Sequence, residues 1–564
     1  MIKSLDLDDL EVQQLRDLNE IFGTLKQKFN DLSEEILKID QSSLACQLHP
    51  VTGRNPYESS LLLQLSYLIL AKTYLKTEGS IQSLTVQNPT QKKILKRYLK
   101  KTSINCKIRA KWRVREYIHL LYGVYTVIQR SFLYSRSKDL SRINTFRNQK
   151  KIILLDTFIL QNSLTAGRFI DRYYPSIRQF ISSSVKDRLV LYPTILGKFK
   201  GKQLNTISKN SEEKILFKQD FLRISDYLRA IKKMVSLSFK IDHPFMFEGL
   251  DVTPLVKRQF LIGKVSKSAF EGILNFMAIQ RMSEWSIDLG LVIDWNENQA
   301  IDKGLVKGVK TFYPGIPTKG YQGYIISTDY NLYIQPTDYE IRADVIPDEI
   351  HVIGKALENR IKENSHNLKV NTSPAFRFNN VYREYPLTEV DRKSLLVILP
   401  IGLAECCDII TLLAKASLSM DMSSFQILIK PHPLVNVGRL KRECGPHWLA
   451  YFTIVEGDFN EIVSQCDLVV GSASSTLMET IVRGIPVIII GSQKGLTQNP
   501  IPAEISKRLW SLCYTEVELS RAIRSFMARS PEDQSADREY AKEIRSEYFE
   551  IIGSKLELLE EVIK

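Results

Sequence analysis

Short apolar runs rich in β-branched residues alternate along the chain with segments of helical periodicity. Runs of this kind are typical of strands buried on both faces of a parallel sheet. One group precedes residue 371 and another follows residue 393, so the alternation predicts two doubly wound, Rossmann-like α/β domains. The runs lie at residues 151–160, 188–196, 289–295, 309–314, 324–327 and 350–354, and then at 395–400, 425–433, 451–457 and 468–470.

The segment before the first long apolar run has a different pattern. Residues 6–40 alternate charge with Leu, Ile and Phe at helical spacing, which predicts a helical leader over residues 1–42. We expect the first domain to begin with a strand at residues 44–48 and a second strand at 81–86. A basic segment, residues 101–150, then interrupts the alternation as a helical insertion.

A polar stretch separates the two predicted domains. Residues 371–393 contain two prolines and show no sustained periodicity, which indicates a linker. Ligands bind outside the carboxyl ends of the strands in such sheets, so we expect those ends to face a central cleft. The predicted order is a first domain, a linker, a second domain and a terminal helix, at residues 43–375, 376–393, 394–535 and 536–564.

The composition is that of an ordinary folded protein. The chain has 564 residues, of which 44% are hydrophobic and 25% charged. No apolar run reaches the roughly 18–20 residues of a membrane span, and the N-terminus lacks the basic start and apolar core of a secretion signal. Seven cysteines without CxxC spacing predict neither disulfides nor a structural metal. These features predict a cytoplasmic protein.

The positive charge of the chain is concentrated in one segment. Residues 91–151 hold ten Lys and eight Arg against Glu116 and Asp139, a charge of +16 in a chain whose net charge is +14. Apolar and aromatic residues are interleaved with these cations over residues 112–134, as in a helix that lies at an anionic membrane surface. A solvated hairpin is the alternative. No nucleic-acid-reading motif is present, so we expect no nucleic acid partner.

The most informative motif is GSASSTLMET, which follows the apolar run at residues 468–470. Gly471 ends the predicted strand, and a helix is expected to begin near Thr476. Free N–H groups at such a helix start suit a phosphate, which Ser474, Ser475 and Thr476 would also contact. Glu479 is placed to accept the hydroxyls of a ribose. A simple N-cap with a capping acid explains the same residue types.

A second motif, IKPHP, ends the apolar run at residues 425–433. Lys430 and His432 are expected to point into the cleft from a loop stiffened by Pro431 and Pro433. A lone histidine of this kind is as often structural as functional. Together with the serine-rich turn about forty residues later, however, it indicates two phosphate-binding elements at the ends of neighbouring strands.

The two motifs together resemble the donor half of GT-B glycosyltransferases. The HP motif followed by a Ser-Ser/Thr turn is similar to that of bacterial transferases that use CMP-activated sugars, the sialyltransferases and Kdo transferases. A KPHP and serine pair also occurs in CDP-glycerol glycerophosphotransferases. The resemblance therefore implies a cytidine nucleotide more specifically than it implies a sugar. The acidic motif of the sialyltransferases has only a faint echo in FEGLD, residues 247–251, so their base is not carried over.

The first domain offers candidate acids in IDWNENQ, residues 293–299. Glu297 is the preferred general base on an acceptor hydroxyl, and Asp294 is the runner-up. An N-cap cluster for the following helix is the alternative. The other acceptor-side candidates, which turn or cap chemistry also explains, are Gln299, Gln322, Arg54 and Asn55.

The order of motifs GRNPYESS, LLDTFIL, WNENQ, GYQGY, PAFR, KPHP and SSTLMET resembles that of bacterial surface-carbohydrate biosynthesis proteins, over residues 43–500. The resemblance implies an inverting GT-B transferase that needs neither metal nor cofactor. It would move a sugar from a nucleotide-activated donor, a CMP-sugar, to a lipopolysaccharide, capsule or lipid-linked acceptor. A glycerophosphotransferase, a nucleotide-sugar 2-epimerase and a nucleotide-binding scaffold are the alternatives.

Overall fold

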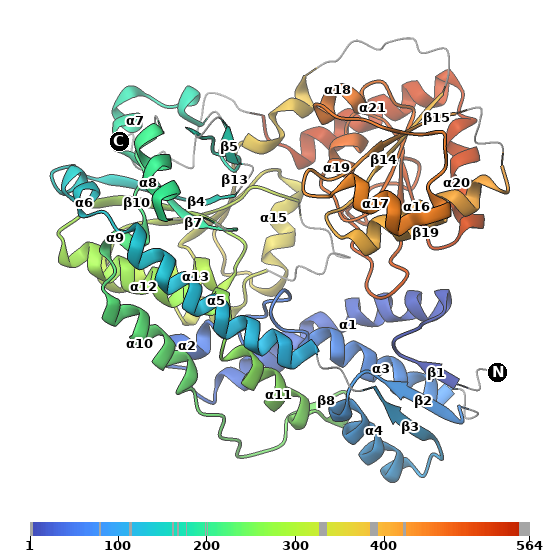
Figure 1. The fold of residues 1–564 in the computed structure, drawn as a ribbon, viewed down its shortest axis with the longest axis horizontal. Helices are drawn as coiled ribbons and strands as arrows, with labels where there is room; N and C mark the ends of the chain where they lie inside the picture. Colours follow the sequence, from blue (N-terminus) through green and yellow to red (C-terminus); the bar gives the residue numbers. More distant parts are fainter. Residues whose placement is uncertain are drawn as a thin grey trace.

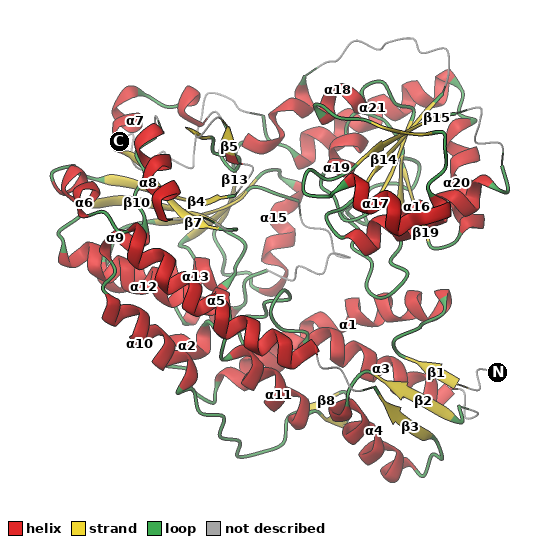
Figure 2. Ribbon diagram, viewed as in Figure 1, coloured by secondary structure: helices red, strands yellow, loops and turns green. Residues whose placement is uncertain are grey.

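The computed structural model contains two six-stranded parallel sheets, each covered by helices (Figures 1 and 2). Together with a smaller N-terminal sheet they account for most of the fold, and their carboxyl edges face each other. The structure describes residues 4–77, 81–111, 115–160, 163–165, 168–175, 177–197, 199, 201–211, 213–325, 335–383, 393–420 and 425–551.

The first sheet has the strand order β13-β12-β11-β10-β4-β7. The chain starts at β4, adds β7 on one side and then β10 on the other, so the winding reverses between β4 and β10. In doubly wound sheets this switch point is where polar groups meet at the carboxyl edge. The strands are β4 (Ile152–Ile159), β7 (Leu189–Ile195), β10 (Leu289–Trp295), β11 (Thr318–Gln322), β12 (Glu349–Val352) and β13 (Val370–Thr372).

The second sheet has the order β16-β15-β14-β17-β18-β19, and its switch point lies between β14 and β17. Every residue of β14, β17 and β18 is buried, which explains why the sequence shows continuous apolar runs. Two doubly wound domains are thus confirmed. The strands are β14 (Ser394–Ile398), β15 (Gln426–Lys430), β16 (Phe452–Ile454), β17 (Leu468–Gly471), β18 (Val487–Ile490) and β19 (Trp510–Cys513).

The N-terminal part forms a unit of its own rather than the first strands of the first domain. β1 (Ser4–Asp6), β2 (Ser83–Val86) and β3 (Lys107–Ala110) pair in parallel as a separate sheet. The strand expected at residues 44–48 is wrong, because the short helix α2 (Leu44–Gln47) occupies this position. The remaining helices of this unit are α1 (Val12–Leu37), α3 (Leu61–Thr77) and α4 (Pro89–Thr102).

One further strand prediction in the first domain is wrong. The apolar run at residues 309–314 belongs largely to helix α13 (Ala300–Phe312), and the strand that follows is β11. The helix packs very closely on α12 (Lys267–Glu284): a Cβ added at Gly304 would lie 2.0 Å from the Gly272 carbonyl oxygen. The strand expected at 324–327 falls partly outside the described residues.

The basic insertion is helical for most of its length, as predicted. It contains α5 (Arg115–Ser137) and α6 (Leu140–Arg147), although β3 also lies within it. Among the described residues, no helix combines the length and apolar character needed to span a membrane.

Both chain ends tie the domains together. From α1, Arg16 forms a 2.6 Å ion pair with Glu518 of the second domain. The terminal helix α21 (Pro531–Tyr548) begins five residues earlier than expected and leads back to the first domain. There the Glu550 N–H donates to the Ile353 carbonyl at 2.6 Å. These contacts hold the two sheets on either side of one cleft.

Candidate functional site

A cleft of about 930 Å³ lies between the carboxyl ends of the two sheets. The second domain contributes the loops after β15 and β17, and the first domain contributes side chains that include Arg172 and Tyr324. Helices α1 and α3 add a third wall through residues such as Phe22 and Leu62. The helical leader is therefore part of the site.

The IKPHP motif lies on the second-domain wall, as predicted. Lys430 is the last residue of β15, and its Nζ donates to the Gly457 carbonyl at 2.7 Å. Burial lowers its pKa, and Asp458 and Glu456 partly offset this. The two acids favour the charged form of the ammonium group beside the cleft.

His432 has a defined tautomer in this structure. The Leu434 N–H donates to His432 Nδ1 at 3.2 Å, so in the neutral ring the proton resides on Nε2. Burial, and then the charge of Arg172, lower the pKa of His432. A neutral imidazole with a proton on Nε2 is a hydrogen-bond donor suited to a phosphate oxygen. The influence of Arg172 also shows that the two domains face each other across the cleft.

The serine-rich turn lines the same wall, through Ser474, Ser475 and Thr476. The predicted helix α19 (Thr476–Ile481) starts where expected but has only six residues, so its dipole contributes less than we expected. Ser474 and Thr476 hydroxyls lie 2.7 Å apart, and the Ser475 side chain makes no cap hydrogen bond. This turn therefore presents hydroxyl groups to the cleft and not the N-terminus of a long helix.

Gly471 and Glu479 support the turn without lining the cleft. A Cβ at Gly471 would lie 3.1 Å from Leu477 Cδ2, so the glycine permits the tight approach of α19 to β17. Glu479 is partly buried, and burial raises its pKa to about 7 in spite of Arg483 and Arg377. Its carboxyl group therefore changes charge near neutral pH. Contact with a ribose stays a prediction for this residue.

On the first-domain side, Glu297 lies just behind the cleft wall. Its Oε1 accepts a hydrogen bond from the Trp295 indole N–H at 3.1 Å. Burial raises its pKa, opposed by this bond and by Arg377. Arg377 and Tyr324, which line the cleft, both interact electrostatically with the Glu297 carboxyl group. Glu297 is the acid of its motif nearest to the cleft-lining groups.

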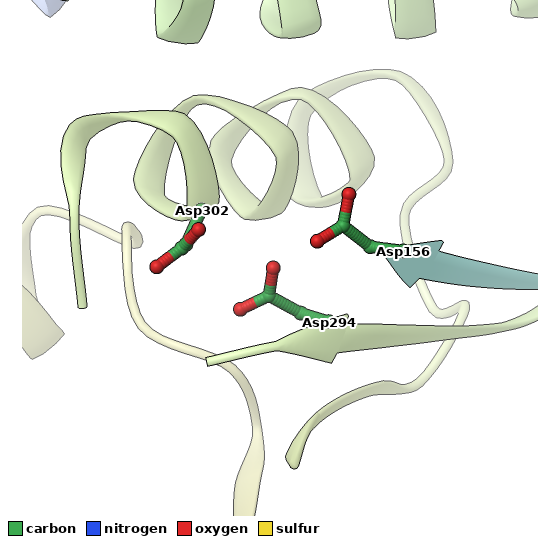
Figure 3. Close-up of side chains that lie close together, drawn as sticks. All are labelled: Asp156, Asp294 and Asp302. Atoms are coloured by element: carbon green, nitrogen blue, oxygen red, sulfur yellow. The ribbon is translucent and has the colours of Figure 1, made fainter. Parts of the chain in front are cut away.

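Asp294, the runner-up base, is buried in a cluster of acids rather than facing the cleft. Figure 3 shows its carboxyl group turned toward those of Asp156 on β4 and Asp302 on α13, at the switch point of the first sheet. Carboxyl oxygens of the three lie within 4.8 Å of one another, and each side chain is at most 2% exposed. Burial, and then neighbouring acids, raise all three pKa values well above the usual range.

The acid cluster is the group of described residues that could hold a metal ion. Three carboxylate oxygens form a donor set that suits hard cations such as Mg²⁺ or Ca²⁺. The alternative is that the carboxyl groups keep their protons, as their raised pKa values favour. In either case the cluster lies beneath the cleft wall and does not line the cleft.

Arg54 and Asn55 are both engaged in the protein. The Arg54 guanidinium pairs with Glu340 at 2.6 Å, and Lys303 pairs with the other oxygen of the same carboxylate at 2.6 Å. Asn55 donates to Ser268 Oγ at 2.9 Å and accepts from the Tyr57 N–H at 2.9 Å. Both residues border the cleft, but their polar groups hold its wall together.

Gln299 and Gln322 occupy buried positions outside the cleft lining. Gln299 is the N-cap of α13 and forms a capping box with Asp302, as the capping alternative predicted. Gln322 ends β11 and is 1% exposed. Their roles toward an acceptor stay predictions.

Sequence reasoning missed three residues of the cleft. Arg172 and Arg377 lie in polar segments without regular periodicity, and only the fold brings them opposite Lys430. Arg377 also lies over the Trp295 ring at 5.6 Å. Tyr57, 70% exposed, presents an aromatic ring to the cleft. The PAFR and RNPY motifs contain two of these residues, but no pattern marks them as ligands.

No protein-family model matches the chain, and no curated protein is similar to it in sequence. Among solved structures, UDP-GlcNAc 2-epimerase from Neisseria meningitidis, bound to UDP-GlcNAc, is similar with a TM-score of 0.41 and 12% identity, over 73% of this chain and 99% of that one. HepE of Anabaena in complex with UDP has a TM-score of 0.41 and 10% identity, over 73% and 99%. Trehalose 6-phosphate synthase from Burkholderia multivorans has a TM-score of 0.40 and 9% identity, over 74% of this chain and 97% of that one. Similarity at this level carries no information on the activity of this chain.

Proposed function

We propose that the chain is a glycosyltransferase that takes a sugar from a nucleotide donor bound in the cleft. The observation that carries this proposal is the convergence of Arg172, Arg377, Lys430 and His432 from both domains on one cleft. Cationic and N–H groups of this kind stabilise the negative charge that develops on a leaving phosphate. The volume of about 930 Å³ accommodates a nucleotide sugar together with part of an acceptor.

The nucleotide is assigned to the second-domain wall. Lys430 and the His432 Nε2–H donate to phosphate oxygens, and the hydroxyl groups of Ser474 and Ser475 add hydrogen bonds. Glu479, behind the same turn, accepts the ribose hydroxyls. The resemblance of KPHP and GSASST to motifs of cytidine-using transferases supports CMP as the nucleotide, and hence a CMP-sugar as the donor.

The acceptor is assigned to the first-domain side. Glu297 removes the proton of an acceptor hydroxyl as its oxygen attacks the anomeric carbon, and the bond from that carbon to the phosphate oxygen breaks. This direct displacement inverts the anomeric centre. The Trp295 N–H orients the Glu297 carboxylate, while burial makes it a stronger base near neutral pH. The acceptor is a surface glycan or its lipid-linked precursor.

A thermal-shift panel with CMP, CDP, UDP and GDP tests the nucleotide. A ligand at 100 times its dissociation constant stabilises the folded state by about 2.7 kcal/mol, so specific binding is easily seen. We expect CMP or CDP to raise the melting temperature most. A clear preference for UDP would contradict the cytidine assignment, and no shift with any nucleotide would contradict the proposal.

Product analysis separates the remaining alternatives. With a CMP-sugar and a glycan acceptor, a transferase releases CMP only when the acceptor is present. Release of CMP from CDP-glycerol would indicate a glycerophosphotransferase, and conversion of UDP-GlcNAc without acceptor would indicate a 2-epimerase. Nucleotide binding with no turnover of any donor would indicate a scaffold.

A further inference from the structure

Helix α5 turns a stripe of large apolar side chains to the solvent. Six residues at helical spacing are between 56% and 68% exposed, while Val127, Arg130 and Tyr134 on the opposite face are buried in the protein. Exposed apolar residues scattered singly are normal, but a continuous stripe marks an interaction surface. The six are Ile118, Leu121, Tyr122, Tyr125, Ile128 and Phe132.

Helix α10 (Ile224–Val235) extends this stripe into a wider face. Ile224, Leu228 and Val235 on α10 are 72%, 65% and 56% exposed. Both helices pack on α12, and Figure 1 shows them along the same side of the first domain. The sequence pattern singled out the basic segment but gave no reason to add α10 to it.

Contacts at both ends hold α5 and α10 beside each other. At one end, a Cβ on Gly123 would lie 2.7 Å from the Val265 carbonyl, and Lys264 donates to the Val235 carbonyl at 3.2 Å. At the other end, Lys138 donates to the Leu222 carbonyl at 2.8 Å. The two helices are therefore held at fixed positions on the first domain, and we call their exposed stripes together the α5–α10 face.

The charges on the α5–α10 face are of one sign. Among the described side chains of the two helices, every exposed charged group is cationic. The acid of α10, Asp226, is buried and pairs with Arg281 at 2.8 Å and with the exposed Arg229. The exposed cations of the helices are Arg136, Arg229, Lys232 and Lys233, and Arg223 is the exposed N-cap residue of α10.

We propose that the α5–α10 face binds the surface of an anionic lipid bilayer, with α5 lying in the interface. Apolar side chains flanked by cations match the acyl boundary and the negative headgroups of such a surface. The 23 residues of α5 form a helix of about 34 Å, which lies along the surface rather than across it. Two copies of the face would repel each other through their like charges, so charge complementarity favours lipid over a second copy of the chain.

The proposal goes beyond the catalytic assignment, because it adds a membrane surface as a partner. It also restricts the acceptor to molecules that are held at such a surface. The two ideas fail separately: vesicle binding is measured without donor, and turnover is measured on a soluble acceptor.

Flotation with vesicles tests the face. The full-length protein should float with phosphatidylglycerol-containing vesicles, less with phosphatidylcholine alone, and less as salt rises. The variant Leu121→Gln, Tyr125→Gln, Ile128→Gln should reduce binding by about tenfold or more, since it removes three apolar side chains that leave water on binding. Its matched control changes three exposed apolar residues elsewhere, Ile170→Gln, Leu418→Gln and Val517→Gln, and should bind like the wild type.

A second variant guards against misfolding of the first. Lys232→Gln with Lys233→Gln touches only exposed side chains, and it should weaken binding to anionic vesicles without changing the melting temperature. Absence of wild-type vesicle binding, or unchanged binding in both variants, would overturn the proposal. A wild-type dimer that the triple variant dissociates, with no vesicle binding, would overturn it in favour of a protein interface.

Discussion

Both sheets carry polar residues near the carboxyl ends of their strands, yet they present them in different ways. Lys430 ends β15, His432 follows it, and both line the cleft, whereas Asp294 in β10 is buried under α13. After β15, Pro431 and Pro433 keep the chain from folding straight into a helix. After β10, α13 begins within five residues and covers the strand end. A polar residue near the carboxyl end of a strand therefore does not necessarily reach the cleft, because the segment that follows the strand can cover it.

The two regions also differ in the charge of the groups that they contain. The second-domain wall exposes an ammonium and a neutral imidazole with a free proton to donate, both useful to a phosphate. The first-domain switch point instead gathers three acids that burial drives toward their protonated forms. Glu297, three residues after Asp294 in the chain, interacts electrostatically with Arg377 and Tyr324, which line the cleft.

The largest effect is expected from the two candidate bases. Glu297→Gln should lower the transfer rate by about 10²–10⁴-fold with little change in nucleotide affinity, because it removes the base but keeps the shape. Asp294→Asn should retain most of the activity. Steady-state kinetics with a fixed acceptor measure both. Inactivity of Asp294→Asn beside an active Glu297→Gln would reverse the assignment.

The next largest effect is expected from the second-domain wall of the cleft. His432→Ala and Ser475→Ala should each raise the dissociation constant of the nucleotide by about ten- to over a hundredfold, the loss of a hydrogen bond to a charged group. Calorimetric titration measures this dissociation constant. His366→Ala, an exposed histidine outside the cleft lining, is the matched control. Wild-type affinity in both cleft variants would reduce these residues to turn formers.

The acid cluster predicts a stability effect of definite sign. The pKa of Asp156 is raised in the folded protein, so its contribution to stability is full at low pH and is lost as pH rises through the folded pKa. Asp156→Asn should therefore melt at a higher temperature than the wild type at pH 8, with a smaller difference at pH 5. A variant that melts lower at pH 8, with a wild type destabilised by EDTA, would show instead that the cluster holds a cation.

The smallest effect concerns Glu479, whose pKa is about 7. Ionisation strengthens its acceptance of ribose hydroxyls, so nucleotide affinity should rise by about five- to tenfold between pH 6 and pH 8. The nucleotide phosphate also titrates in this range, so Glu479→Gln serves as the reference. If the two proteins show the same pH profile, Glu479 does not contact the ribose.

The sequence was informative where local pattern and tertiary role agree. Continuous apolar runs identify β4, β10 and β14 because strands buried on both faces admit few polar residues. The pattern failed at residues 309–314, since Val309 serves equally well in a buried helix, and at residues 44–48 for the same reason. Short apolar runs do not distinguish the two structures.

The candidate site shows a similar division. Motifs with proline and small hydroxyl residues predicted from the sequence which loops of the second domain line the cleft. The acid cluster joins residues that are 138 positions apart in the chain, Asp156 and Asp294, and its third member, Asp302, lies outside the IDWNENQ motif. Arg172 and Arg377 reach the cleft through long-range packing, which no local pattern records.

Hydrogen–deuterium exchange with saturating CMP tests the central claim most directly, because it locates the nucleotide without assuming a reaction. If the nucleotide binds to the second domain, exchange should slow in residues 430–435 and 472–478 and stay unchanged in residues 152–159 and 289–295. Protection confined to the ends of β4 and β10, with none after β15 and β17, would contradict the assignment of the donor to the second domain.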